Sequence, residues 1–169
     1  GLKGACIGGH LEIIKMMIEL GANDYNGGFE GACIGGHDAV VKMMLDLGDN
    51  NYNMGLYFAC EGGHLEVIKM MLSKGANNYN KGLAGACSGG HLEIVKMMLY
   101  FGANYYNYGL CYACRGGHIE IVKMMIELGA NIYDSLKHGN LELQILYRRL
   151  SGKNITLPIK TDHPEYHLL

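Results

Sequence analysis

The pattern of apolar and polar residues along the first 135 positions predicts a series of short, paired helices. In the first pair, a helix is expected over residues 2–7, a Gly-Gly pair then breaks it, and a second helix is expected over residues 10–20. In this second helix Glu12, Lys15 and Glu19 share one face, whereas apolar residues cover most of the circumference. We therefore predict one thin solvated stripe and burial of the rest.

Small residues mark the expected helix ends. Gly21 follows the second helix and can take the left-handed conformation that closes many helices. An asparagine near the end of each unit is predicted to cap the next first helix, at Asn26, Asn53, Asn80 and Asn107.

The same 27-residue series occurs five times. It reads G-L-x-x-A-C-x-G-G-H-L-E-I-V-K-M-M-L-x-x-G-A-N-x-Y-N-x, and its copies begin at Gly1, Gly28, Gly55, Gly82 and Gly109. A two-helix unit of this size cannot bury so much apolar surface by itself, so neighbouring copies must stack. The expected fold is all-α, an α-solenoid of helix-turn-helix repeats over residues 1–135.

The run A-C-x-G-G-H-L-E-I-V-K-M-M-L-x-x-G-A-N resembles the ankyrin repeat. Ankyrin repeats have about 33 residues, and the missing residues fall where that family carries its β-hairpin finger. The resemblance therefore implies shortened loops with little or no β-structure. Short repeats rich in Asn, Tyr and Met also resemble those of large DNA viruses that infect protists, which implies a viral origin.

The repeat phase breaks after Ser135. Residues 136–150 are interpreted as a degenerate C-terminal capping repeat, because Arg148 and Arg149 replace apolar positions there. Residues 151–169 are interpreted as a C-terminal tail. The first copy has no polar cap, so we expect further repeats upstream of Gly1 and a surface there that could self-associate.

Composition narrows the classes of partner. The 169 residues are 49% apolar and 18% charged with a formal net charge of −2, so neither general disorder nor nucleic-acid binding is expected. No stretch is apolar for long enough to span a membrane, and neither catalytic nor cofactor-binding motifs occur. We therefore predict a non-enzyme with no cofactor and no membrane contact.

The repeated cysteines and histidines are interpreted as structural. Stacked copies lie too far apart for disulfides or a shared metal, so the cysteines are assigned to the core and each histidine to a hydrogen bond with loop backbone. Cys111 lies at a variable position and is expected to be a partly exposed thiol. Reduced thiols favour an intracellular location, which for a viral protein is the host cytoplasm.

Positions that vary between copies are where a partner can be recognised. In ankyrin-like stacks the first helix lines the concave side, and aromatic residues gather there in the third to fifth copies. The predicted partner-binding residues are Tyr57, Phe58, Glu61, Ser88, Tyr105, Tyr108, Cys111, Tyr112 and Arg115.

Two function classes follow. The first is a non-catalytic scaffold that holds a partner protein in its concave groove. The alternative is a structural or assembly subunit, such as a virion or oligomer component, that stacks on other chains through its open N-terminal face or an apolar spot at Tyr100 and Phe101. A third function class is a small-molecule or enzymatic role, which needs a polar pocket with a strongly perturbed titratable group. The alternative interpretation of the concave aromatic residues is that they only fill space left by the missing hairpin.

Overall fold

The computed structural model describes residues 1–48 and 51–131. This part of the chain is all-helical, which confirms the predicted fold class, and the expected capping repeat and tail lie outside it. The helices are α1 (Leu2–Ile7), α2 (Leu11–Glu19), α3 (Tyr25–Gly35), α4 (Asp38–Asp46), α5 (Tyr52–Gly62), α6 (Leu65–Ser73), α7 (Tyr79–Gly89), α8 (Leu92–Tyr100), α9 (Tyr106–Gly116) and α10 (Ile119–Glu127).

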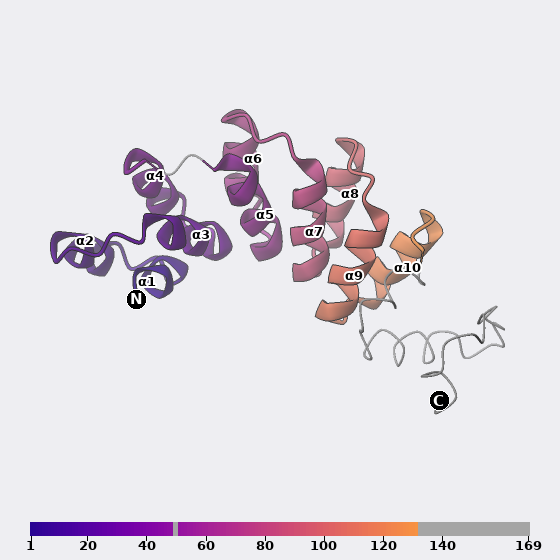
Figure 1. The fold of residues 1–169 in the computed structure, drawn as a ribbon, viewed down its shortest axis with the longest axis horizontal. Coiled ribbons are helices and arrows are strands. Elements are labelled where there is room, and N and C mark those ends of the chain that lie inside the picture. The colour runs from indigo at the N-terminus through magenta and orange to yellow at the C-terminus, as the bar shows by residue number, and fades with distance from the viewer. Residues whose placement is uncertain (49–50, 132–169) are drawn as a thin grey trace, which may run out of the picture.

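The helix pairs form an arch (Figure 1). The odd-numbered helices pack closely against one another along its inner side, whereas successive even-numbered helices on the outer side make fewer contacts. Tighter packing on one side bends the stack toward that side. The concave surface is therefore built by α1, α3, α5, α7 and α9, as the resemblance implied.

A continuous apolar core runs through the stack, because each helix pair buries the same repeat positions. In the third copy Leu56, Val67, Ile68 and Met71 are fully buried. Gly55 allows the two helices of this pair to approach, since a Cβ at that position would lie 2.5 Å from the Met71 sulfur. The prediction that copies share one core is confirmed.

The Gly-Gly-His segment connects each copy to the one before it. Gly36 ends α3 in the left-handed conformation with φ of 72°, which suits glycine. His37 then places Nε2 2.8 Å from the Ile7 carbonyl oxygen, and His64 lies 2.7 Å from that of Ile34. The predicted hydrogen bond to backbone is confirmed, but its acceptor belongs to the preceding copy rather than to the local loop.

The predicted helix caps are wrong. The first helices begin before Asn26, Asn53, Asn80 and Asn107, and their N-caps are Asp24, Asn51, Asn78 and Tyr105. The Asp24, Asn51 and Asn78 side chains accept from the backbone N–H three residues later, at 3.0 to 3.2 Å.

The asparagine in the first turn of α5 and of α7 has a different role. The Asn80 Oδ1 accepts from the backbone N–H groups of Asn104 and Tyr105 at 2.8 and 3.0 Å, and Asn53 does the same for Asn77 and Asn78. These side chains hold the loop of the next copy. Helix-cap chemistry and loop anchoring use the same residue type, so the sequence pattern alone confused them.

The second helices are also shorter and more exposed than predicted. In the first copy the helix covers Leu11–Glu19 rather than residues 10–20, and Ile13, Met16 and Leu20 are exposed. The loops between pairs contain no strand within the described residues, which confirms that the hairpin finger is shortened. None of the described helices is both long enough and apolar enough to cross a bilayer.

Candidate functional site: the concave surface

Three helices supply most of the predicted partner-binding residues. Tyr57, Phe58 and Glu61 follow one another at helical spacing on α5, and Tyr108, Tyr112 and Arg115 do so on α9. Between them α7 contributes mainly small residues. On the concave side, the face of α7 consists of Ala84, Gly85 and Ser88.

Gly85 is what lets α5 and α7 approach each other on this side. A Cβ at Gly85 would collide with the backbone oxygen of Tyr57. Ala84 is only 4% exposed, because the neighbouring helices and their side chains cover it. The surface over α7 is therefore filled from both sides by larger residues of α5 and α9.

Aromatic side chains meet over α7. The ring centroids of Tyr57 and Tyr112 lie 6.3 Å apart in an edge-on arrangement, although the two residues belong to the third and fifth copies. Tyr57 also contacts Phe58 at 5.0 Å, and Tyr112 contacts Tyr108 at 5.7 Å. The Arg115 guanidinium lies 5.8 Å from the centre of the Tyr112 ring, within cation–π range. We call these five residues the concave cluster.

A short polar network borders the concave cluster. The Ser88 hydroxyl donates to Glu61 Oε1 at 2.9 Å and also hydrogen-bonds Tyr57. Burial is the main cause that raises the pKa of Tyr57 to about 12, and the nearby Glu61 carboxylate adds to it. Tyr57 is thus a neutral hydrogen-bonding group over the physiological pH range.

Two residues outside the predicted set extend this surface toward the first copy. Lys3 forms a 2.8 Å ion pair with Glu30, and the Lys3 Nζ also lies 5.5 Å from the centre of the Phe58 ring. Sequence reasoning missed both residues as site members. The available signal was their opposite charge at the same repeat position in adjacent copies.

Two predicted residues stand apart from the concave cluster. Tyr105 is the N-cap of α9, exposed, and tied through its backbone to Asn80. Cys111 is a half-buried free thiol on α9, as predicted for its variable position. Within the described part of the chain, no ring contact joins Tyr105 to the concave cluster.

Members of the concave cluster differ in exposure. Tyr57 and Phe58 are half-buried and pack against each other, which favours a packing role for them. Tyr108 is 61% exposed, and Arg115 is exposed without an acidic partner among the described residues. The accessible part of the cluster therefore lies on α9.

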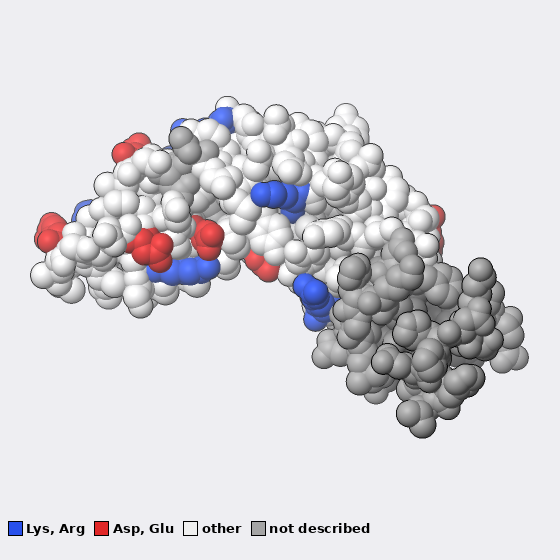
Figure 2. All heavy atoms as spheres, in the orientation of Figure 1, with Lys and Arg blue, Asp and Glu red and all other residues white. Residues whose placement is uncertain are grey.

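The surrounding charge is mixed. Figure 2 shows the hollow beneath the arch, with acidic and basic residues of both signs along the visible part of its edge. Glu30 is paired with Lys3, and Glu61 accepts from Ser88. Attraction of a partner by charges of one sign is therefore not the main feature of this surface.

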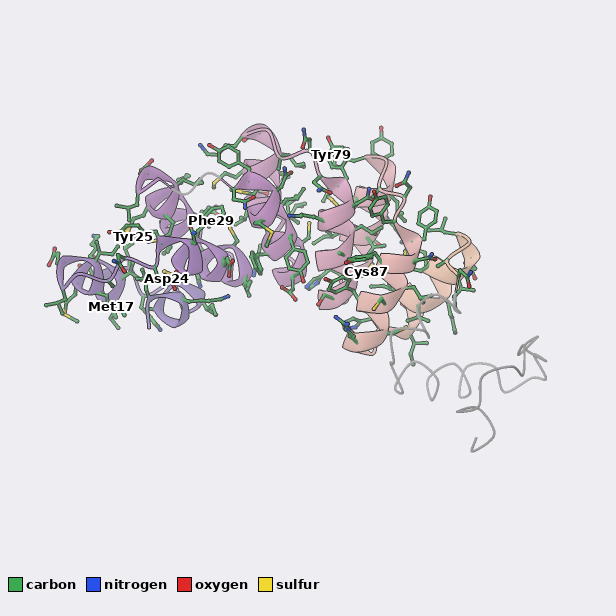
Figure 3. The ribbon with its side chains drawn as sticks, in the orientation of Figure 1. Met17, Asp24, Tyr25, Phe29, Tyr79 and Cys87 are labelled. Carbon is green, nitrogen blue, oxygen red and sulfur yellow. The ribbon has the colours of Figure 1, made fainter. Side chains whose placement is uncertain are left out.

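A second aromatic group lies at the loop edge, away from the concave cluster. Tyr79, at the start of α7, stacks on Phe101 with ring centroids 5.4 Å apart (Figure 3). Tyr100 contacts Phe101 at 5.8 Å and is 87% exposed. The apolar spot expected at Tyr100 and Phe101 thus consists mainly of the exposed Tyr100 side chain. Tyr100 contacts Phe101, and Phe101 is in turn supported by Tyr79.

The repeated cysteines are buried in the core. Cys87 is a residue of α7 (Figure 3), and a Cβ at Gly109 of α9 would be 3.2 Å from its sulfur. Burial raises the pKa of Cys60, Cys87 and Cys114 to about 12. The core assignment made from the sequence agrees with these positions.

Comparison with known proteins identifies the repeats. Residues 56–135 match the family model for ankyrin repeats (three copies). Among solved structures, the fold is similar to the crystal structure of the human ASB11 ankyrin repeat domain, with a TM-score of 0.53 and 24% sequence identity over 93% of this chain and 86% of that chain. No curated protein matches the sequence. Residues 56–135 thus match ankyrin repeats, which generally serve as protein-interaction modules, and the fold of the described residues is that of an ankyrin repeat domain.

Proposed function

We propose that this ankyrin-repeat chain is a non-catalytic scaffold that binds a partner protein on its concave surface. The observation that carries the proposal is the concave cluster, in which the exposed Tyr108 and Arg115 both contact the Tyr112 ring, and that ring contacts Tyr57 of the third copy. Tyr and Arg are enriched among residues that dominate binding energy. A rigid support lowers the entropic cost of using them.

The proposed contact residues divide by role. Tyr108, Tyr112 and Arg115 would touch the partner, whereas Tyr57, Phe58, Glu61 and Ser88 would mainly hold the surface in shape. Tyr105 and Cys111 are proposed as peripheral contacts, since Tyr105 is the exposed N-cap of α9 and Cys111 is a half-buried residue of the same helix.

We also propose an intracellular location, which for a viral protein is the host cytoplasm. Its support is that Cys6, Cys60, Cys87, Cys111 and Cys114 are thiols outside disulfides, a state that persists in a reducing compartment. Non-catalytic action is supported by the groups with a shifted pKa among the described residues, which are Tyr57 and core cysteines, each shifted mainly by burial.

The test is a comparison of matched exposed substitutions. Partners are captured with the unchanged chain and identified by mass spectrometry, and the dissociation constant of each is then measured with purified proteins. Tyr108→Ala and Arg115→Ala should each weaken binding about tenfold or more, as expected for central contact residues. Tyr100→Ala and Lys123→Ala are the controls, because both residues are exposed and lie off the concave surface.

The outcomes separate the candidates. Equal loss from the test and control variants, or no loss from either, would contradict the concave scaffold. The second candidate, an assembly subunit, is favoured by the apolar residues that α1 and α2 expose at the end of the arch. A molar mass that rises with protein concentration in sedimentation, together with intact partner binding by the Tyr108→Ala variant, would support the assembly subunit instead.

A further inference from the structure

Arg115 is the charged member of the concave cluster, and its charge is not neutralised within the described part of the chain. It is exposed and forms no ion pair with a described residue. By contrast, Lys3 is paired with Glu30 at 2.8 Å, and Glu61 accepts from the Ser88 hydroxyl at 2.9 Å. Although charge along the whole concave surface is mixed, the charge left unpaired in the concave cluster is therefore positive.

The Tyr112 ring holds Arg115 without cancelling its charge. The guanidinium carbon lies 5.8 Å from the centre of that ring, and Tyr108 contacts the same ring at 5.7 Å. A cation–π contact orients a guanidinium but supplies no carboxylate to neutralise it. A guanidinium held in this way can still donate two parallel hydrogen bonds to a planar carboxylate.

The helix itself does not require a cation at this position. Arg115 lies in the last turn of α9, where a basic residue suits the helix dipole. The first helices of the four preceding copies have no basic residue in their last turn, and the equivalent residues are Ile7, Ile34, Glu61 and Ser88. An intermolecular role therefore accounts for Arg115 better than a structural one.

We propose that Arg115 pairs with an aspartate or glutamate of an extended partner segment, whose next apolar side chain on the same side packs on the Tyr108 and Tyr112 rings. This inference rests on the concave scaffold proposed above and names the chemistry of its partner. A carboxylate is favoured over a phosphate, because phosphorylated motifs are bound by clusters of arginines and the concave cluster has a single arginine. Glu61, at the same repeat position on α5, would repel a carboxylate, so the acidic residue is expected over α9.

The spacing of the three side chains fits an extended segment. Tyr108, Tyr112 and Arg115 lie at i, i+4 and i+7 on one face of α9, and the steps from ring to ring and from ring to guanidinium are 5.7 and 5.8 Å. In an extended chain, side chains two residues apart point the same way and are separated by about 6.6 Å. The proposed segment therefore has an acidic residue and an apolar residue with one residue between them.

The test selects peptides on the full chain. A phage-displayed library of random peptides is selected on the unchanged chain and on the Arg115→Glu, Arg115→Gln and Lys123→Glu variants. The unchanged chain should enrich an acidic residue two positions from an apolar one, Arg115→Glu should enrich a basic residue there, and Arg115→Gln should enrich neither charge. Lys123→Glu makes the same charge change on an exposed residue of α10, off the concave surface, and should select the same acidic peptides as the unchanged chain.

A selected peptide then gives the size of the effect. Its acidic residue is changed to the corresponding amide, and dissociation constants are measured by fluorescence anisotropy. The amide should weaken binding to the unchanged chain about tenfold but change binding to Arg115→Gln by less than about twofold, because that variant lacks the guanidinium that the carboxylate pairs with. Helical circular dichroism of each variant checks that its fold is intact.

The outcomes separate this inference from the scaffold itself. Peptides without an acidic preference, an equal loss from the amide in both chains, or a library that gives no binder would overturn the acidic segment as the partner. Peptides that lack the preference but lose binding to a Tyr108→Ala variant would leave the concave scaffold standing. Peptides that bind Tyr108→Ala and Arg115→Gln as tightly as the unchanged chain would count against both proposals.

Discussion

The rings of Tyr57 and Tyr112 meet 6.3 Å apart although a complete repeat separates the helices that carry them. The contact is possible because α7, which lies between α5 and α9, presents only Ala84 and Gly85 at this level. Lys3 and Phe58 are related in the same way at the other end of the surface, at 5.5 Å, with Gly31 on the helix between them. Small residues on alternate copies thus allow large side chains to interact two copies apart.

Gly85→Ala tests this close approach. The added methyl group would collide with the Tyr57 carbonyl, a backbone atom that cannot move alone, so we expect a loss of about 1 to 3 kcal/mol in the free energy of unfolding. Urea unfolding followed by circular dichroism measures it. Gly4→Ala is the matched control, since a Cβ there meets no atom within 4 Å. Equal stability of the two variants would show that α5 and α7 can separate without cost.

His64→Ala tests the contact between copies. The substitution removes the 2.7 Å hydrogen bond to Ile34, and the part-buried carbonyl loses its partner, which should cost about 1 kcal/mol. His10→Ala is the control, because His10 has no such bond among the described residues. If both variants unfold at the same urea concentration, the histidine series contributes nothing to coupling between copies.

Asn78→Ala tests the corrected position of the helix cap. The Asn78 side chain accepts from Lys81 N–H at 3.0 Å, and its loss should destabilise the chain by about 1 kcal/mol. Asn77→Ala, one residue earlier and exposed, should change stability by less than about 0.5 kcal/mol because its side chain does not cap α7. Thermal unfolding of the two variants distinguishes them, and a larger loss from Asn77→Ala would contradict the assigned cap.

Alkaline pH should destabilise the fold through the core thiols. Burial raises the pKa of Cys60, Cys87 and Cys114 from an ordinary value of 9 to about 12. The folded state therefore favours the protonated thiol, so stability is complete below pH 9 and falls as the pH rises through 12. Tyr57 acts in the same direction from pH 10 upward. Urea midpoints measured between pH 7 and 11 should fall.

The triple variant Cys60→Ala, Cys87→Ala and Cys114→Ala is the control for that fall. It should start from a lower stability at pH 7 but lose less on going to pH 11, because three of the titrating groups are gone. An unchanged slope of the midpoint against pH would show that other groups cause the alkaline loss.

Thiol labelling should single out Cys111. It is the half-buried cysteine, whereas the five repeated cysteines are buried. An aromatic disulfide reagent at neutral pH should therefore modify one thiol rapidly and the rest only on unfolding, as measured by mass spectrometry after peptide digestion. Fast modification of Cys33 or Cys87 in the native chain would contradict the packing of the core.

The sequence by itself determined the repeat, the helix pairs and the shared core. Residues such as Leu56, Val67 and Met71 recur at a fixed 27-residue spacing, and helical periodicity depends on local backbone geometry and burial, which the order of residues encodes directly. The concave placement of Tyr112 and Arg115 followed from the same register. The repeat, the helix pairs and the core could be predicted because each of them recurs in all five copies.

Only the tertiary structure decided which residues meet between copies. The acceptor of His64 lies 30 residues earlier, Asn80 holds the next loop instead of capping its own helix, and Tyr57 reaches Tyr112 across α7. These contacts depend on how far each copy is displaced and rotated relative to its neighbour. That displacement is set by the packing of all the inner and outer helices together, through steps such as the close approach at Gly85, and not by the local sequence of any one repeat.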